Sequence, residues 1–142
     1  MNGIKMSDCK FYIDESARTV VCVIPNTEYM VEDFIDEHFN FNEIDCTAFG
    51  RLRSAIRMPN SFMGKAVCSP DDEWNEETGR LIAYAKAKDK CYKSFFKRAN
   101  HYVQVFDRRL GNMIEILNDF GLKLSERKEK IEAAIDSKVA KE

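Results

Sequence analysis

The sequence predicts an α+β fold: a small antiparallel sheet of two hairpins, a short acidic helix, and a long C-terminal helix or helical hairpin. Residues 1–74 hold short β-branched and aromatic runs separated by turn residues, whereas from Asn75 onward apolar residues recur at the helical period. The length of 142 residues, with 44% hydrophobic content, is typical of one domain. We therefore expect a single domain over 1–142: mainly β with one short helix over 1–74, a long helix over 75–122, and a C-terminal helix with a frayed end over 125–142.

The first hairpin is predicted from two strand-forming runs, 10–13 and 19–24, which are rich in aromatic and β-branched residues. The polar stretch between them favours a turn, and Pro25 ends the second run because proline cannot donate to a strand ladder. Apolar residues then recur at helical spacing within 28–39, which predicts a short acidic helix.

A second hairpin is expected from the runs 46–58 and 62–68, with Pro59-Asn60 as its turn. Because side chains alternate across a strand, this register would place three arginines on one face, opposite the small residues Gly64 and Ala66 and beside one aromatic ring. Guanidinium groups next to open space and a ring can hold phosphate and stack a base. The candidate ligand-binding residues of this hairpin are Arg51, Arg53, Arg57 and Phe62.

The same arginines have a structural interpretation, which the sequence leaves open. They could lie on a solvated outer face, or they could form salt bridges with the acidic helix through Glu32, Asp33 and Asp36. Further basic candidates lie on the long helix, and of these we include Arg109 among the predicted ligand-binding residues. The others are Lys97, Arg98 and Arg108, which could equally be solvent-facing positions.

The long helix is expected to begin with Asn75 as its cap, followed by Glu76 and Glu77 at the positive end of the helix dipole. Gly111-Asn112 could divide it, Gly121 is a natural C-cap, and Ser125 could cap a last helix. Such a helix exceeds what a small sheet can cover, so its aromatic residues predict self-association as a homo-oligomer, dimer or higher. The alternative is a helix that folds back at Gly111. The aromatic residues are Phe95, Tyr102 and Phe106.

Composition excludes several classes of protein. The net charge is −2, unlike the strongly basic balance of a general nucleic-acid binder, and we expect no sequence-specific nucleic acid as a partner. No apolar run reaches the length of a membrane span, and the N-terminus lacks the apolar stretch of a signal peptide. The five cysteines form no metal or disulfide spacing, which favours reduced thiols in a reducing compartment such as a bacterial cytoplasm.

Catalysis is not expected. His38 and His101 belong to no metal or nucleophile motif, and the chain has no glycine-rich phosphate loop. The acidic residues after Ser69-Pro70 are typical of the first turn of a helix rather than of metal ligands. The sequence therefore predicts a protein that is not an enzyme, with no catalytic residue, no metal and no cofactor.

One stretch resembles small accessory proteins of phages and prophages of Gram-positive bacteria. It comprises residues 64–79, GKAVCSPDDEWNEETG, which run into 80–88, RLIAYAKAK; the earlier segment 18–24, RTVVCVI, followed by an acidic helix, is similar to the same group. Within that group the overall plan resembles the Thoeris anti-defence sponge proteins. The resemblance implies a non-enzymatic α+β homo-oligomer that binds a cyclic nucleotide immune signal and withholds it from effectors without cleaving it.

The expected function is thus a phage anti-defence sponge in the host bacterial cytoplasm, with a cyclic or ADP-ribose-type signalling nucleotide as its partner. The alternative is a phage inhibitor that binds a host defence protein directly, for example a CRISPR nuclease. In that case the acidic N-terminal half would mimic nucleic acid, or the long helix would insert into a groove of the partner.

Overall fold

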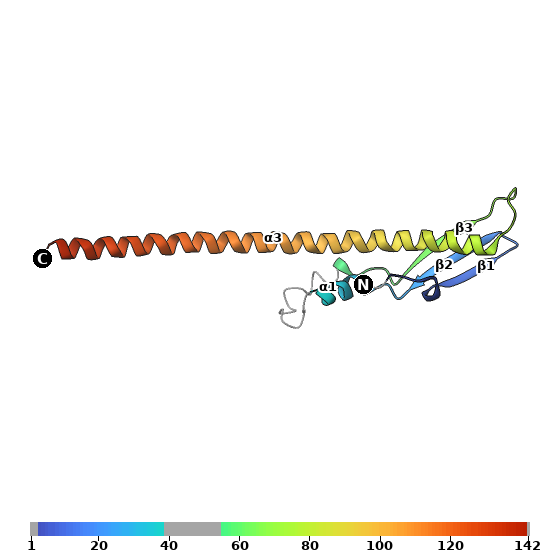
Figure 1. The fold of residues 1–142 in the computed structure, drawn as a ribbon, viewed down its shortest axis with the longest axis horizontal. Helices are drawn as coiled ribbons and strands as arrows, with labels where there is room; N and C mark the ends of the chain where they lie inside the picture. The colour runs from blue at the N-terminus through green and yellow to red at the C-terminus, as the bar shows by residue number, and fades with distance from the viewer. Residues whose placement is uncertain (1–2, 39–54, 142) are drawn as a thin grey trace. The chain divides into compact units, whose positions relative to one another are not determined.

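The computed structural model describes residues 3–38 and 55–141 and confirms the α+β fold class (Figure 1). The chain divides into two compact units, Met1–Tyr102 and Val103–Glu142, and one helix contributes to both. Among the described residues, no helix has the length and apolar character required to cross a membrane. The elements, in chain order, are η1 (Met6–Asp8), β1 (Lys10–Asp14), β2 (Thr19–Pro25), α1 (Met30–His38), β3 (Ser61–Val67) and α3 (Glu76–Ala140).

The sheet has three antiparallel strands in the order β1-β2-β3. The first predicted hairpin is confirmed, with Phe11 opposite Cys22 across the β1–β2 pair. Alternate residues of β2 are buried, namely Val20, Cys22 and Ile24, so one face of the central strand is covered. The sheet therefore has one face against the core, as expected for a small antiparallel sheet.

The second predicted hairpin is wrong. β3 pairs with β2 rather than with a strand before Pro59, and Ala55 and Ile56 are helical. Positions 46–54 of the expected strand lie outside the described residues. Burial still alternates over 55–58, with Ile56 and Met58 buried, but the backbone there does not pair with β3: the amide of Met58 donates to the Glu28 carbonyl oxygen at 3.1 Å, and β2 is the strand that pairs with β3.

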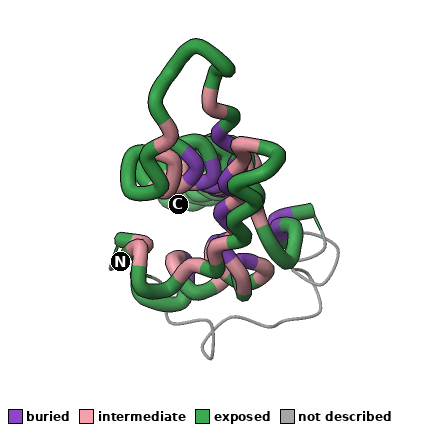
Figure 2. The backbone as a smooth tube through the Cα atoms, turned by 90° about the vertical axis from the view of Figure 1, so that its right-hand side faces the viewer, coloured by how far each residue is buried: buried purple, intermediate pink, exposed green. Residues whose placement is uncertain are grey.

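Small side chains allow α3 to lie close against the sheet. A Cβ on Gly64 of β3 would overlap the carbonyl oxygen of Ala83 and the amide nitrogen of Ala87 on α3. A Cβ on Gly79 would lie 2.7 Å from a methyl carbon of Val20 in β2. Buried positions gather where these elements meet (Figure 2). The small residues that seemed to leave open space for a ligand are therefore the residues against which the helix packs.

The helix α3 is continuous, so it does not divide at Gly111-Asn112, an alternative that the sequence left open, and the predicted stop at Gly121 and separate last helix from Ser125 are wrong. A glycine inside a helix weakens it without necessarily ending it, and neither Gly111 nor Gly121 adopts the positive φ of a helix C-cap. The predicted start is confirmed, because the amide of Thr78 donates to Asn75 Oδ1 at 3.1 Å.

Of two shorter elements predicted from the sequence, one is confirmed and one is wrong. The acidic helix is confirmed as α1, which buries Val31 and Ile35. The segment from Ser69 to Asp72 is a turn rather than the first turn of a helix, with the amide of Asp72 donating to the Ser69 carbonyl oxygen at 3.1 Å.

Candidate functional site

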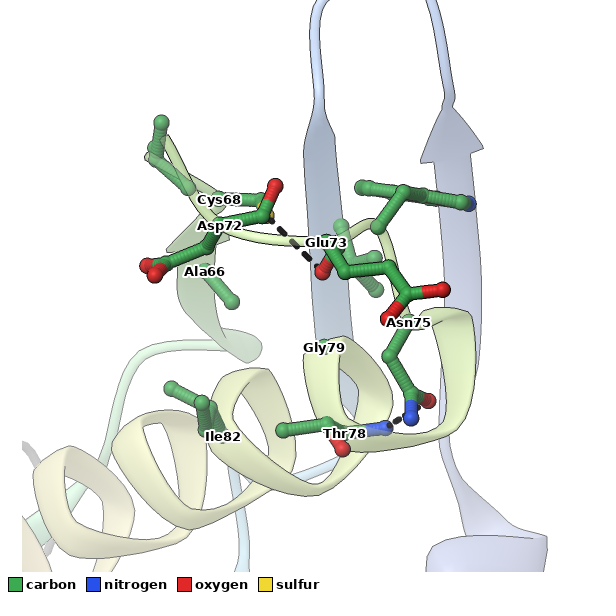
Figure 3. A pocket seen from close by; sticks show the side chains of 11 residues that line it. Ala66, Cys68, Asp72, Glu73, Asn75, Thr78, Gly79 and Ile82 are labelled. Atoms are coloured by element: carbon green, nitrogen blue, oxygen red, sulfur yellow. Dashed lines mark hydrogen bonds between the residues drawn. The ribbon is translucent and has the colours of Figure 1, made fainter. Parts of the chain in front are cut away.

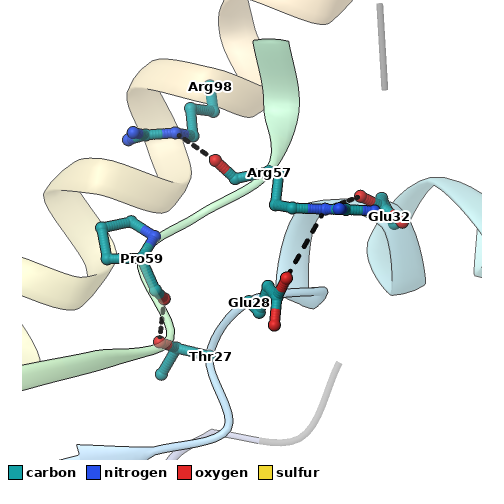
Figure 4. Close-up of polar contacts among 6 residues, drawn as sticks. All are labelled: Thr27, Glu28, Glu32, Arg57, Pro59 and Arg98. Atoms are coloured by element: carbon teal, nitrogen blue, oxygen red, sulfur yellow. Dashed lines mark hydrogen bonds and ion pairs between the residues drawn. The ribbon is translucent and has the colours of Figure 1, made fainter. Parts of the chain in front are cut away.

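Arg57, one of the predicted ligand-binding arginines, is held by the acidic helix (Figure 4). Its Nε lies 3.7 Å from Oε1 of both Glu28 and Glu32, and its guanidinium stacks over the ring of Tyr29 with 5.1 Å to the centroid. The backbone nearby is pinned as well, since Thr27 Oγ1 donates to the Pro59 carbonyl oxygen at 2.6 Å. For Arg57 the structural interpretation, a salt bridge to the acidic helix, is therefore confirmed.

The other predicted site residues are not gathered around Arg57. Phe62 is half-buried and shares its strand face with Gly64 and Ala66, which α3 covers. Arg109 is exposed and belongs to the second unit. Arg51 and Arg53 lie outside the described residues. The open arginine face that the sequence predicted depended on the wrong hairpin, and within the described residues it does not form.

A smaller cavity on α3 has the charge that an anion requires. It encloses about 220 Å³ and is lined by Ala55, Lys97, Arg98 and His101. Arg98 is oriented by two contacts: its Nε donates to the Arg57 carbonyl oxygen at 3.1 Å, and its Nη1 donates to the hydroxyl of Ser94. Those contacts orient the guanidinium of Arg98 at the cavity that Lys97 and His101 also line. We refer to this group as the basic cavity.

Two larger cavities have the opposite character. One of about 410 Å³ lies between the end of β3 and the start of α3 and carries the carboxylates of Asp72 and Glu73 (Figure 3). Another of about 410 Å³ lies beside α1 and carries the side chains of Asp8, Asp33 and Glu37. Neither includes a lysine or arginine among its described lining residues, so both repel phosphate rather than attract it.

Arg18 is the side chain that holds the turn beside the first of these cavities. Its Nη2 donates to the carbonyl oxygens of Ser69, at 2.9 Å, and of Asp72, and it lies 3.2 Å from Cys68 Sγ. Arg18 has a positive φ of 51°, so its backbone closes the β1–β2 turn while its side chain reaches the loop before α3. The sequence does not reveal this role, because the partners lie some 50 positions away.

The stretch that carries the family resemblance is explained largely by packing. Gly64 and Gly79 permit the close approach of sheet and helix, and Asn75 caps α3. Two lysines of the same stretch or just after it bind the edge strand: Lys86 Nζ donates to the Lys65 carbonyl oxygen at 3.1 Å, and Lys90 Nζ to that of Met63 at 2.9 Å. The motif is therefore a signature of this sheet–helix junction.

The described cysteines are free thiols, and burial raises the pKa of three of them, Cys9, Cys22 and Cys91. Desolvation raises the pKa of Cys22 to about 12 and that of Cys91 to about 11. Such thiols are poor nucleophiles at neutral pH. Over residues 3–38 and 55–141, no group of three His, Cys, Asp or Glu side chains is placed to hold a metal ion.

No family model, curated protein or solved structure matches the chain. The resemblance to phage accessory proteins therefore rests on the residues quoted above, and the resemblance to anti-defence sponges rests on the overall plan of the chain; both stay predictions.

Proposed function

We propose that this protein is a non-enzymatic sponge that binds a phosphorylated signalling nucleotide, cyclic or of ADP-ribose type, and withholds it from host effectors. The observation that supports the proposal is the basic cavity. Lys97, Arg98 and His101 converge there from a single helix turn, and the backbone of Arg57 fixes the position of Arg98.

The size of the basic cavity indicates which part of a nucleotide it would hold. Ligand pockets for drug-sized molecules enclose roughly 300–1,000 Å³, so a cavity of about 220 Å³ fits a phosphate or diphosphate group rather than a whole nucleotide. Arg98 would donate to a phosphate oxygen from Nη2, because its Nε and Nη1 already hold the Arg57 carbonyl and the Ser94 hydroxyl, while Lys97 would contribute a point charge. The base would lie outside this cavity.

Isothermal titration of the full chain against cyclic nucleotides and ADP-ribose tests the proposal. We expect micromolar binding of at least one of them, weakened by added inorganic phosphate. The double substitution Lys97→Ala, His101→Ala should weaken that binding by about tenfold or more, because charge-assisted contacts to phosphate are lost. The control is Lys93→Ala, one turn earlier, whose side chain is paired with Asp89 at 2.8 Å outside the cavity.

Two results would contradict the proposal. Absence of heat for every nucleotide in the panel would remove the sponge function. Binding that the double substitution and the control affect equally would remove the basic cavity from it.

A second candidate function, direct inhibition of a host defence protein, is favoured by one observation. Asp33 and Asp36 are exposed on α1, next to the acidic cavity beside that helix, and together they form a negative surface of the kind that could occupy a nucleic-acid channel. Capture of a host nuclease in stoichiometric amount, abolished by Asp33→Asn with Asp36→Asn and accompanied by inhibition of nucleic-acid binding, would support this function instead of the sponge.

A further inference from the structure

The second unit carries a regular row of exposed apolar side chains. Large apolar residues recur every seven positions, at Val103, Leu110, Leu117, Leu124 and Ile131, and each is between 43% and 64% exposed. A second row follows three positions after the first and includes Met113, Phe120 and Ala134. Apolar residues at the first and fourth positions of successive heptads are the pattern of a coiled coil.

The surface of α3 also has a hollow of the kind that a side chain from a facing helix fills in a coiled coil. In a coiled coil, each apolar side chain inserts into a hole formed by four residues of the facing helix, at positions i, i+3, i+4 and i+7. A hollow of about 360 Å³ on α3 is lined by one such set, together with two flanking charged residues. The set is Phe120, Lys123, Leu124 and Arg127.

The helix of the second unit has few packing contacts that would stabilise it as a single chain. Residues 107–141 are exposed throughout, so the second unit contributes almost no packing to its own stability. Isolated helices depend on such packing, and Gly111 and Gly121 weaken this one further. Burying both rows from two chains would remove on the order of 1,000–2,000 Å² from water, which is the range of stable protein interfaces.

We propose that residues 103–134 bind a second copy of this chain as an antiparallel two-stranded coiled coil. The two apolar rows of each chain would form the contact between the helices, which we call the seam. The Arg127 side chain indicates the orientation, because it occupies a core position of the heptad. In a parallel dimer it would face the partner's Arg127, and Lys123 would face the partner's Lys128. Reversing one helix removes both repulsions.

One antiparallel register pairs large apolar residues at the centre of the seam and sets Arg127 against the partner's Leu110. Leu117 then packs against the partner's Phe120, and the hollow around Leu124 receives the partner's Met113. At the edges of the seam the charges offset one another: Asp107 lies near the partner's Lys128, which attracts it, and Arg109 lies near the partner's Lys130, which repels it. Ile114 lies beside the partner's Gly121, where the absence of a side chain leaves room for it. The seam and the basic cavity are on different units, so this inference does not depend on the proposed nucleotide binding.

Light scattering of the full chain after size exclusion tests the seam. We expect twice the 16.5 kDa mass of the chain. Leu117→Lys should weaken the dimer about a hundredfold, since it places a charge in the seam. The matched control is Leu122→Lys, which should remain dimeric: the two leucines are 64% and 66% exposed, but Leu122 lies on the outer face. Fluorescence of the single tryptophan, Trp74, reports whether the first unit is still folded.

Disulfide cross-linking tests the orientation. The double substitution Met113→Cys, Leu124→Cys should give a covalent dimer on air oxidation, whereas Ile131→Cys alone should not. A monomeric wild-type chain, or equal weakening by the two lysine variants, would overturn the proposed seam. Cross-linking through Ile131→Cys but not through the double variant would overturn the antiparallel register. Neither outcome affects the titration with nucleotides, which tests the basic cavity of the first unit.

Discussion

The two parts of α3 differ in the size of the residues along one face. Up to Tyr102 the buried positions are mostly small, with Gly79, Ala83 and Ala87 lying where the helix meets the sheet. After Tyr102 the regularly spaced residues are large and exposed, with Leu117 as one example. Small residues bring backbones together, whereas large ones interdigitate between helix axes roughly 8–10 Å apart. One helix thus packs on its own sheet through small residues in its first part and carries a regular row of large exposed apolar residues in its second.

Gly64 is the position where a small substitution should disturb the contact between sheet and helix most. Gly64→Ala should lower the free energy of unfolding by about 3 kcal/mol, because its Cβ would overlap backbone atoms of Ala83 and Ala87 that cannot rotate away. Urea unfolding followed by Trp74 fluorescence measures the loss. Unchanged stability would mean that the helix does not approach the sheet as closely as the structure shows.

The sequence predicts elements well and pairings poorly, and Gly64 shows why. The strand around Gly64 is visible from its own residues, since local alternation and turn chemistry determine that it forms. Its partner is not visible, because pairing with Cys22 instead of a preceding strand depends on contacts 42 positions away. The wrong partner made Gly64 seem to open a ligand site, when in the structure it admits a helix.

The candidate site was predicted less completely than the fold for the same reason. The acidic residues that could pair with arginine were identified, and Glu32 does pair with Arg57. Lys97 and Arg98 were noted from charge alone, but their convergence with His101 requires the helix register and the position of Ala55. The sequence does not indicate the role of Arg18, because the residues around it predict only a turn.

The next largest expected effect is the pH dependence of the free energy of unfolding, which should differ between the two units. Every cysteine precedes the second unit, and burial holds the pKa of Cys22 near 12 and of Cys91 near 11, against an ordinary value of 9.0. Below pH 9 both states keep these protons. Above it the unfolded chain loses them first, so the free energy of unfolding falls as pH rises, by up to about 1.4 kcal/mol per thiol per pH unit.

Urea titrations between pH 8 and 10.5, read by Trp74 fluorescence, measure that slope. Cys91→Ala provides the comparison, since it removes one of the thiols whose pKa burial raises and should reduce the slope whatever its effect at pH 8. Equal slopes in the two proteins would show that Cys91 ionises as readily in the folded chain as in the unfolded one.

The smallest expected effect is that of a substitution at Gly111, which lies in open surroundings, unlike Gly64. Gly111→Ala adds the same single carbon to the same helix, but nothing lies within 4 Å of the new Cβ. The substitution should stabilise the helix of the second unit by about 1 kcal/mol, because alanine loses less backbone entropy than glycine. Thermal unfolding by far-UV circular dichroism should shift upward, while the Trp74 transition of the first unit stays in place. Gly111 is also outside the proposed seam, so a destabilised variant would reveal a neighbouring chain where the heptad positions put none.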